Sequence, residues 1–146
     1  MLPYLEGERT PNLPTATGTL AGLRGGNMTP ENLARAAVEG MLCGLADGLA
    51  ALRATGVEAR RVLLIGGASR SAAVQAVAAG LFGVPVELPE PAEYVALGAA
   101  RQAAWTLSGA AEPPAWHRPA RTLDPATDDG APVLAAYSEA RQQVYG

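Results

Sequence analysis

The chain has 146 residues, the size of one domain, and is long enough to bury a core without help from disulfides or a metal ion. Its net charge of −3 excludes the strongly basic surface by which proteins hold nucleic acids or anionic membranes. All 11 basic residues are arginine, so no lysine is available for a Schiff base or a phosphate-binding P-loop, and a single cysteine excludes an internal disulfide.

Residues 1–28 are expected to be irregular, because prolines and glycines interrupt them repeatedly: Pro3, Gly7, Pro11, Pro14, Gly18, Gly22, Gly25 and Gly26. A free-standing domain rarely opens with so long a structureless stretch. The pattern therefore predicts that the chain begins inside a larger fold.

A long helix is predicted from about 30 to 55. Thr29 can cap its start, apolar residues recur at helical spacing, and Gly56 ends the run. Glycine weakens a helix, so glycines repeated on one face predict close packing against another stretch of backbone: Gly40, Gly44 and Gly48.

A strand over 61–65 follows, and its apolar run predicts burial on both faces of a sheet covered by helices. The next elements are a helix over 71–82 and a short strand over 84–88. This second strand is expected near a sheet edge, because Pro85 cannot donate a hydrogen bond to a ladder.

A helix over 92–107 completes a core that spans 29–108. Residues 109–131 are rich in proline and are expected to form a linker to a C-terminal helix within 132–146. The apolar face of that last helix is predicted to comprise Val133, Ala136, Tyr137, Ala140 and Val144.

The alternation of helices and strands predicts an α/β fold with parallel strands flanked by helices. Two strands alone make a poor sheet. We therefore expect either that the sheet is truncated on its N-terminal side or that a partner chain completes it.

The strongest candidate site is the junction between the first strand and the next helix, Gly66-Gly67-Ala68-Ser69-Arg70-Ser71. Two glycines let a ligand approach the backbone, and the helix that follows offers free N–H groups and a partial positive charge. Ser69 or Ser71 can cap that helix. The same pattern also fits a tight turn with a serine cap, so the spacing alone leaves both interpretations open. It matches neither a dinucleotide-binding glycine motif nor a P-loop.

The remaining polar residues favour structural roles. Glu6, Glu8 and Arg9 form a charged cluster that is expected to be solvated or bridged, and His117 stands in the linker without an evident partner. Cys43 falls on the apolar side of the first helix. Three acidic residues in the linker lack the spacing of a calcium loop and are interpreted as a solvated turn: Asp124, Asp128 and Asp129.

Several segments together resemble the FGGY family of carbohydrate kinases, and within it the xylulokinases. Residues 2–11 resemble "LPYLxGERTP", and residues 18–23 resemble the "GxxxGL" that follows it. Residues 33–40 are similar to a helix with the pattern "LxRAxxEG", residues 64–71 resemble "LIGGGARS", and residues 96–100 match "ALGAA". Their order and separations also agree, and the resemblance extends from residue 2 to about 107.

The resemblance implies an actin-like ATPase fold of two lobes, each built on a ribonuclease-H-like sheet, with this chain as the latter part of the second lobe. It implies that the 66–71 loop binds the adenosine of ATP, which acts with Mg²⁺. The cofactor-binding residues would be Gly66, Gly67, Ala68, Ser69 and Ser71.

The resemblance implies that the parent enzyme phosphorylates D-xylulose. Most contacts to the sugar, and the catalytic aspartate, would belong to an N-terminal lobe. No catalytic residue is therefore assigned in this chain, and we expect it to be inactive alone. The alternatives are a non-catalytic interaction module, including a homodimer, or a kinase for glycerol, gluconate or ribulose. No secretory signal or membrane span is visible, so a cytoplasmic protein that binds neither nucleic acid nor membrane is expected.

Overall fold

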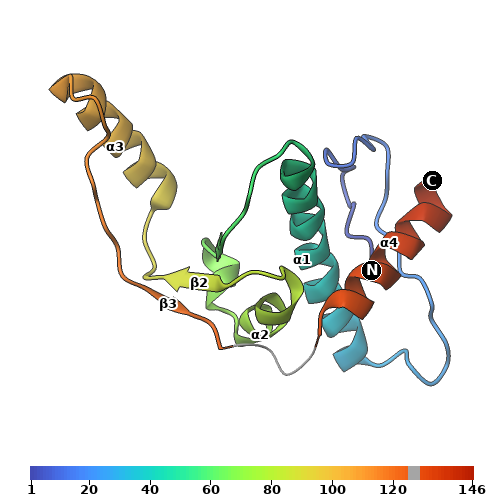
Figure 1. Cartoon of the computed structure of the whole chain (residues 1–146). Coiled ribbons are helices and arrows are strands. Elements are labelled where there is room, and N and C mark those ends of the chain that lie inside the picture. Colours follow the sequence, from blue (N-terminus) through green and yellow to red (C-terminus); the bar gives the residue numbers. More distant parts are fainter. Residues whose placement is uncertain (125–128) are drawn as a thin grey trace.

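The computed structural model describes residues 1–124 and 129–146 (Figure 1). Residues 125–128, which include Asp128 and part of the predicted linker, lie outside the described residues. The described part contains four α-helices and a small mixed sheet of three strands. None of these helices is both long enough and apolar enough to cross a membrane.

Helix α1 (Pro30–Ala54) forms where the sequence predicts it. The Thr29 hydroxyl accepts a hydrogen bond from the Asn32 backbone N–H at 3.3 Å, and this caps the N-terminus. The predicted close approach of another backbone is found at Gly40, where a Cβ would lie 2.4 Å from the Met1 carbonyl oxygen. It is not found at Gly48, which has no such neighbour within 4 Å.

The sheet has the order β1 (Val62–Leu63), β2 (Val86–Pro89), β3 (Ala120–Thr122). Strands β1 and β2 are parallel, with Val62 opposite Val86, and β3 is antiparallel to β2, with Leu88 opposite Arg121. The third strand was not predicted, because it lies within the expected linker.

The prediction that the second strand lies near an edge is wrong, since β2 is the central strand. Pro85 precedes β2 and takes part through its carbonyl oxygen, which accepts a hydrogen bond from the Val62 N–H at 2.9 Å. A proline is tolerated there because the ladder uses its acceptor and not the missing donor.

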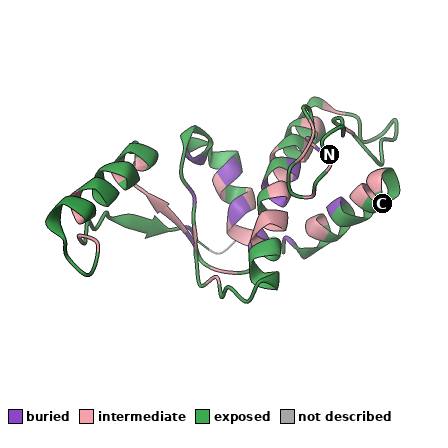
Figure 2. Ribbon diagram, turned by 90° about the horizontal axis from the view of Figure 1, so that it is seen from above, coloured by how far each residue is buried: buried purple, intermediate pink, exposed green. Residues whose placement is uncertain are grey.

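The core extends from the sheet and α2 (Ala72–Leu81) across α1 to α4 (Ala131–Tyr145) and the N-terminal segment, and Figure 2 shows buried residues spread over these elements. Leu42, Ala78 and Val86 are among its most buried side chains. The first strand is not buried on both faces as predicted: Leu64 is buried, but Leu63 and Ile65 are 50% and 48% exposed. Helices therefore cover β1 on one face only, within the described residues.

Helix α3 (Tyr94–Ser108) projects away from the other helices as an arm (Figure 1). It has no buried residue, and Val95 and Leu107 are almost fully exposed. The arm is held mainly to the chain that follows it, since the Arg101 and Trp105 side chains donate to the backbone oxygens of Pro114 and Ala110, both at 2.7 Å.

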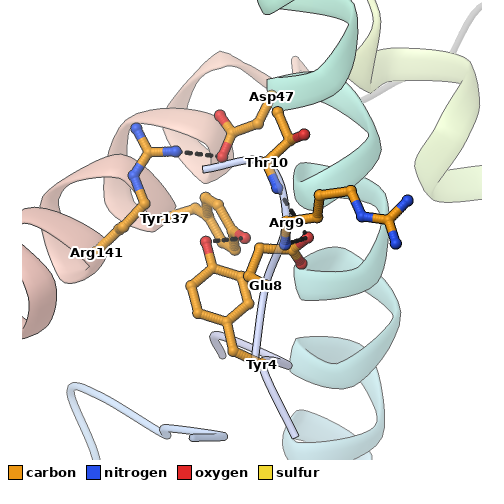
Figure 3. Close-up of polar contacts among 7 residues, drawn as sticks. All are labelled: Tyr4, Glu8, Arg9, Thr10, Asp47, Tyr137 and Arg141. Carbon is orange, nitrogen blue, oxygen red and sulfur yellow. Dashed lines mark hydrogen bonds and ion pairs between the residues drawn. The ribbon is translucent and has the colours of Figure 1, made fainter. Parts of the chain in front are cut away.

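Helix α4 (Ala131–Tyr145) packs against α1 and the N-terminal segment (Figure 3). The buried Tyr4 and Tyr137 hydroxyls share a hydrogen bond of 2.9 Å, and Arg141 forms an ion pair with Asp47 of α1. The predicted apolar face is partly wrong. Ala136 and Val144 are exposed, whereas the packed face includes the partly buried Leu134 and Tyr145.

Candidate functional site

The predicted loop emerges from the sheet as a tight, open turn. Gly66 has φ +91°, a backbone conformation that other residues rarely adopt, and a short 3₁₀ helix, η1 (Gly67–Arg70), follows it. The 3₁₀ turn was not expected from the sequence. A Cβ added at Gly66 or Gly67 would meet no atom within 4 Å, so the space over both glycines is open.

The two serines of the loop both serve its local structure. The Ser71 hydroxyl accepts from the Val74 N–H at 3.5 Å and caps α2, as one of the two expected capping residues. Ser69 is buried, and its hydroxyl donates to the Gly66 carbonyl oxygen at 2.7 Å, which closes the turn. Of the five predicted binding residues, Gly66, Gly67, Ala68 and Ser71 are exposed.

A cavity of about 720 Å³ lies between α1 and α2 and begins at the first turn of α2, directly after the loop. Its walls include small apolar residues such as Ala34 and Ala76, together with Gln75 and Arg121. None of the five predicted binding residues lines it. The loop and this cavity are thus neighbouring features that meet at the start of α2.

Charges of both signs surround the cavity. Arg35 and Glu39 form an ion pair at 2.6 Å on α1. Glu31 lies in the first turn of α1, where its own backbone N–H and the Thr29 hydroxyl donate to the carboxylate and lower its pKa. The walls carry an excess of negative charge, because four acidic side chains line the cavity against the two basic ones of Arg35 and Arg121.

Sequence reasoning missed Gln75 and Arg121. The Gln75 side chain donates to the Ser69 carbonyl oxygen at 2.7 Å and accepts from the Arg121 guanidinium at 2.7 Å. A signal for Gln75 existed, because it is the only polar side chain in α2. Nothing in the sequence pointed to Arg121, since its position depends on the unpredicted strand β3.

The other polar candidates lie apart from the loop. The Glu8 carboxylate accepts from the backbone N–H groups of Arg9 and Thr10, at 2.7 and 3.2 Å, so a turn and not an arginine side chain satisfies it (Figure 3). Cys43 is buried in α1, as expected. Across residues 1–124 and 129–146, no three His, Cys, Asp or Glu side chains gather into a metal site.

Comparison with known proteins gives a consistent result. The C-terminal domain of the FGGY family of carbohydrate kinases matches residues 1–107. The chain is 46% identical over 110 residues to the xylulose kinase of Streptomyces coelicolor, covering 75% of this chain and 23% of that protein. It is also 38% identical over 101 residues to a Geobacter glycerol kinase, covering 68% of this chain and 20% of that protein.

The fold agrees with a solved relative as well. The crystal structure of xylulose kinase from Bifidobacterium adolescentis superimposes with a TM-score of 0.80 and 48% identity, covering 96% of this chain and 28% of that one. The chain therefore spans about a quarter of the length of the relatives it matches. Because sugar kinases of this kind have the actin-like ATPase fold, the expected fold class is confirmed.

Proposed function

The chain belongs to the FGGY family of carbohydrate kinases, and we propose that it forms the nucleotide-binding part of an ATP-dependent sugar kinase. The observation that carries this proposal is the open turn at the carboxyl end of β1, within the residues that match the family. In α/β sheets ligands gather at this end of the strands, where helix N-termini attract phosphate groups. The adenosine of ATP would pack on Gly67 and Ala68, beside the first turn of α2.

We propose D-xylulose as the sugar and its 5-hydroxyl as the phosphoryl acceptor. The similarity to two xylulose kinases, in sequence and in fold, supports this choice, whereas the match to a glycerol kinase keeps a polyol as the alternative. A cytoplasmic location belongs to the same proposal, because ATP is the proposed donor.

We further propose that the sugar contacts and the catalytic base come from parts of the relatives that this chain does not match, so that the chain alone does not transfer phosphate. Phosphoryl transfer depends on positioning and on charge stabilisation from both sides of the reacting group. We propose that Mg²⁺ binds through the ATP phosphates, because the described residues contain no group of three or more His, Cys, Asp or Glu side chains that could bind it.

Isothermal titration with ADP tests the nucleotide site. We expect millimolar or tighter binding by the wild-type chain, and a loss of at least about tenfold in a Gly67→Glu/Ser71→Arg double variant. The glutamate would fill the open space over Gly67 and repel phosphate, and the arginine would remove the cap of α2.

The matched control is Gly98→Glu/Ser108→Arg, which introduces the same two side chains into α3, away from the loop. It should bind ADP like the wild type. Circular dichroism verifies that all three proteins are folded. A folded wild-type chain that does not bind ADP, or a double variant that binds it equally well, would contradict the proposed site.

A second candidate role is an interaction module, and the half-exposed apolar side chains of Leu63 and Ile65 favour it. Together they leave an apolar patch on the uncovered face of β1. Association of two copies of the chain through this face stays a prediction.

A further inference from the structure

Two hydrogen bonds in series join the C-terminal strand to the predicted nucleotide loop. The Arg121 guanidinium on β3 donates to Gln75 Oε1 at 2.7 Å, and Gln75 Nε2 donates to the Ser69 carbonyl oxygen at 2.7 Å. Ser69 is the buried residue of the turn, whereas Arg121 comes from a segment about fifty residues later in the chain. The connection thus spans the loop, the first turns of α2, and β3.

Each bond strengthens the other. A glutamine amide has a donor side and an acceptor side, and a flip of the amide exchanges them. The guanidinium can only donate, so it pairs with the amide oxygen of Gln75 and thereby directs the Gln75 NH₂ group toward Ser69. Hydrogen bonds linked in this way also polarise one another.

The position of Arg121 is itself fixed by the sheet. Arg121 pairs with Leu88 of β2, and two residues later the Leu123 N–H donates to the Val86 carbonyl oxygen at 2.8 Å. The Leu123 side chain is buried in the core. Figure 1 shows β3 beside β2. Because β2 also pairs with β1, the strand that leads into the loop, one sheet places both Arg121 and the loop.

The bond to Ser69 acts on the orientation of the turn. A peptide unit is planar, so a hydrogen bond that holds the Ser69 carbonyl also sets the direction of the Arg70 N–H. A turn that begins with two glycines has unusual freedom, and ordering it during ligand binding costs free energy. Holding the turn in place beforehand removes part of that cost.

We propose that Arg121 and Gln75 are positioning residues, through which β3 holds the 66–71 loop in its nucleotide-binding conformation. The inference rests on the proposed function of that loop. It goes beyond the family relationship, because the family match ends at residue 107 and does not include Arg121.

Two variants separate the links. Arg121→Met keeps the side-chain stem and removes the guanidinium, whereas Gln75→Glu keeps an acceptor for Arg121 and removes the donor to Ser69. Arg118→Met is the control, since Arg118 is exposed and lies in the same segment. Arg121→Lys, which retains one donor toward Gln75, should restore part of the wild-type behaviour.

The main measurement is hydrogen exchange followed by mass spectrometry on peptides that cover residues 66–71, because it needs no ligand. We expect exchange about fivefold faster in Arg121→Met and Gln75→Glu, the usual effect of losing one hydrogen bond. Exchange in α1 and α4 should not change. ADP titration of the same proteins should show binding weaker by a similar factor, with Arg118→Met like the wild type.

The outcomes are distinct. Unchanged exchange in the loop of both variants would overturn the inference, and so would exchange that rises equally throughout the chain, because the residues would then support the fold as a whole. If the wild type binds no ADP, the proposed function fails, while the exchange data still decide whether β3 holds the loop.

Discussion

At the scale of single residues, Cys43 shows how burial determines chemistry. Its side chain is fully buried in α1, and this burial, reinforced by the nearby carboxylates of Glu39 and Asp47, raises the pKa of the thiol from 9.0 to about 11. Burial and the hydrogen bond to Tyr4 likewise raise the pKa of Tyr137. The thiol is therefore a core group at neutral pH and is not positioned to act as a nucleophile.

These shifts predict a loss of stability at alkaline pH. The folded state holds the Cys43 proton more tightly than the unfolded state, so its stabilising effect is complete below pH 9 and is lost as pH rises toward 11. The midpoint of thermal unfolding should fall across this range, and it should fall less in Cys43→Ala, which has no thiol to ionise. Melting curves at neutral and alkaline pH measure this, and identical declines in both proteins would refute the role of Cys43.

At the scale of elements, the helices were predictable and the third strand was not. Thr29 and Gly56 at α1, and Ser71 and Gly83 at α2, provide local start and stop signals that need no tertiary contact. Strand β3 has no such signal: it lies in a proline-rich stretch and becomes a strand because the open edge of β2 pairs with it.

The same distinction applies to the candidate site. The loop could be predicted because a glycine pair between an apolar strand and a helix is a local pattern. The side chains proposed to hold the loop could not be predicted, because the contact of Arg121 with Gln75 requires β3 to be in place. A side chain is hard to assign from sequence when its element is itself created by tertiary pairing.

The docking of α4 on the N-terminal segment gives a second prediction at this scale. Tyr4 and Tyr137 are 1% and 6% exposed, and each hydroxyl is the partner of the other. Either single change to phenylalanine should lower the free energy of unfolding by ~1–3 kcal/mol, because it leaves a buried hydroxyl unpaired.

Changing both tyrosines should cost less than the sum of the single changes, because no unpaired hydroxyl remains. Urea unfolding of the four proteins in this cycle measures the coupling. Tyr94→Phe at the start of α3 is the control for loss of a hydroxyl outside the core, since the half-buried Tyr94 donates only to the nearby Glu90 carbonyl oxygen. Strict additivity would mean that the two hydroxyls do not interact in solution.

At the scale of the whole molecule, stability is unevenly distributed. Helices α1, α2 and α4 share one core with the sheet, while the α3 arm extends from it with its apolar side chains exposed (Figures 1 and 2). Exposed surface away from packing contacts contributes little to the free energy of unfolding, whereas the shared core contributes most of it.

This division predicts opposite results for two leucine substitutions. Leu107 at the end of the arm is 91% exposed, so Leu107→Gln should change the free energy of unfolding by no more than about 0.5 kcal/mol. Leu42 in α1 is 0% exposed, and Leu42→Ala should cost ~2–5 kcal/mol, because it removes buried methyl groups and leaves a cavity. Denaturant unfolding at neutral pH measures both. A Leu107→Gln loss as large as that of Leu42→Ala would mean that the arm folds back onto the core in solution, and the apolar face of α3 would then contribute to the stability of the chain.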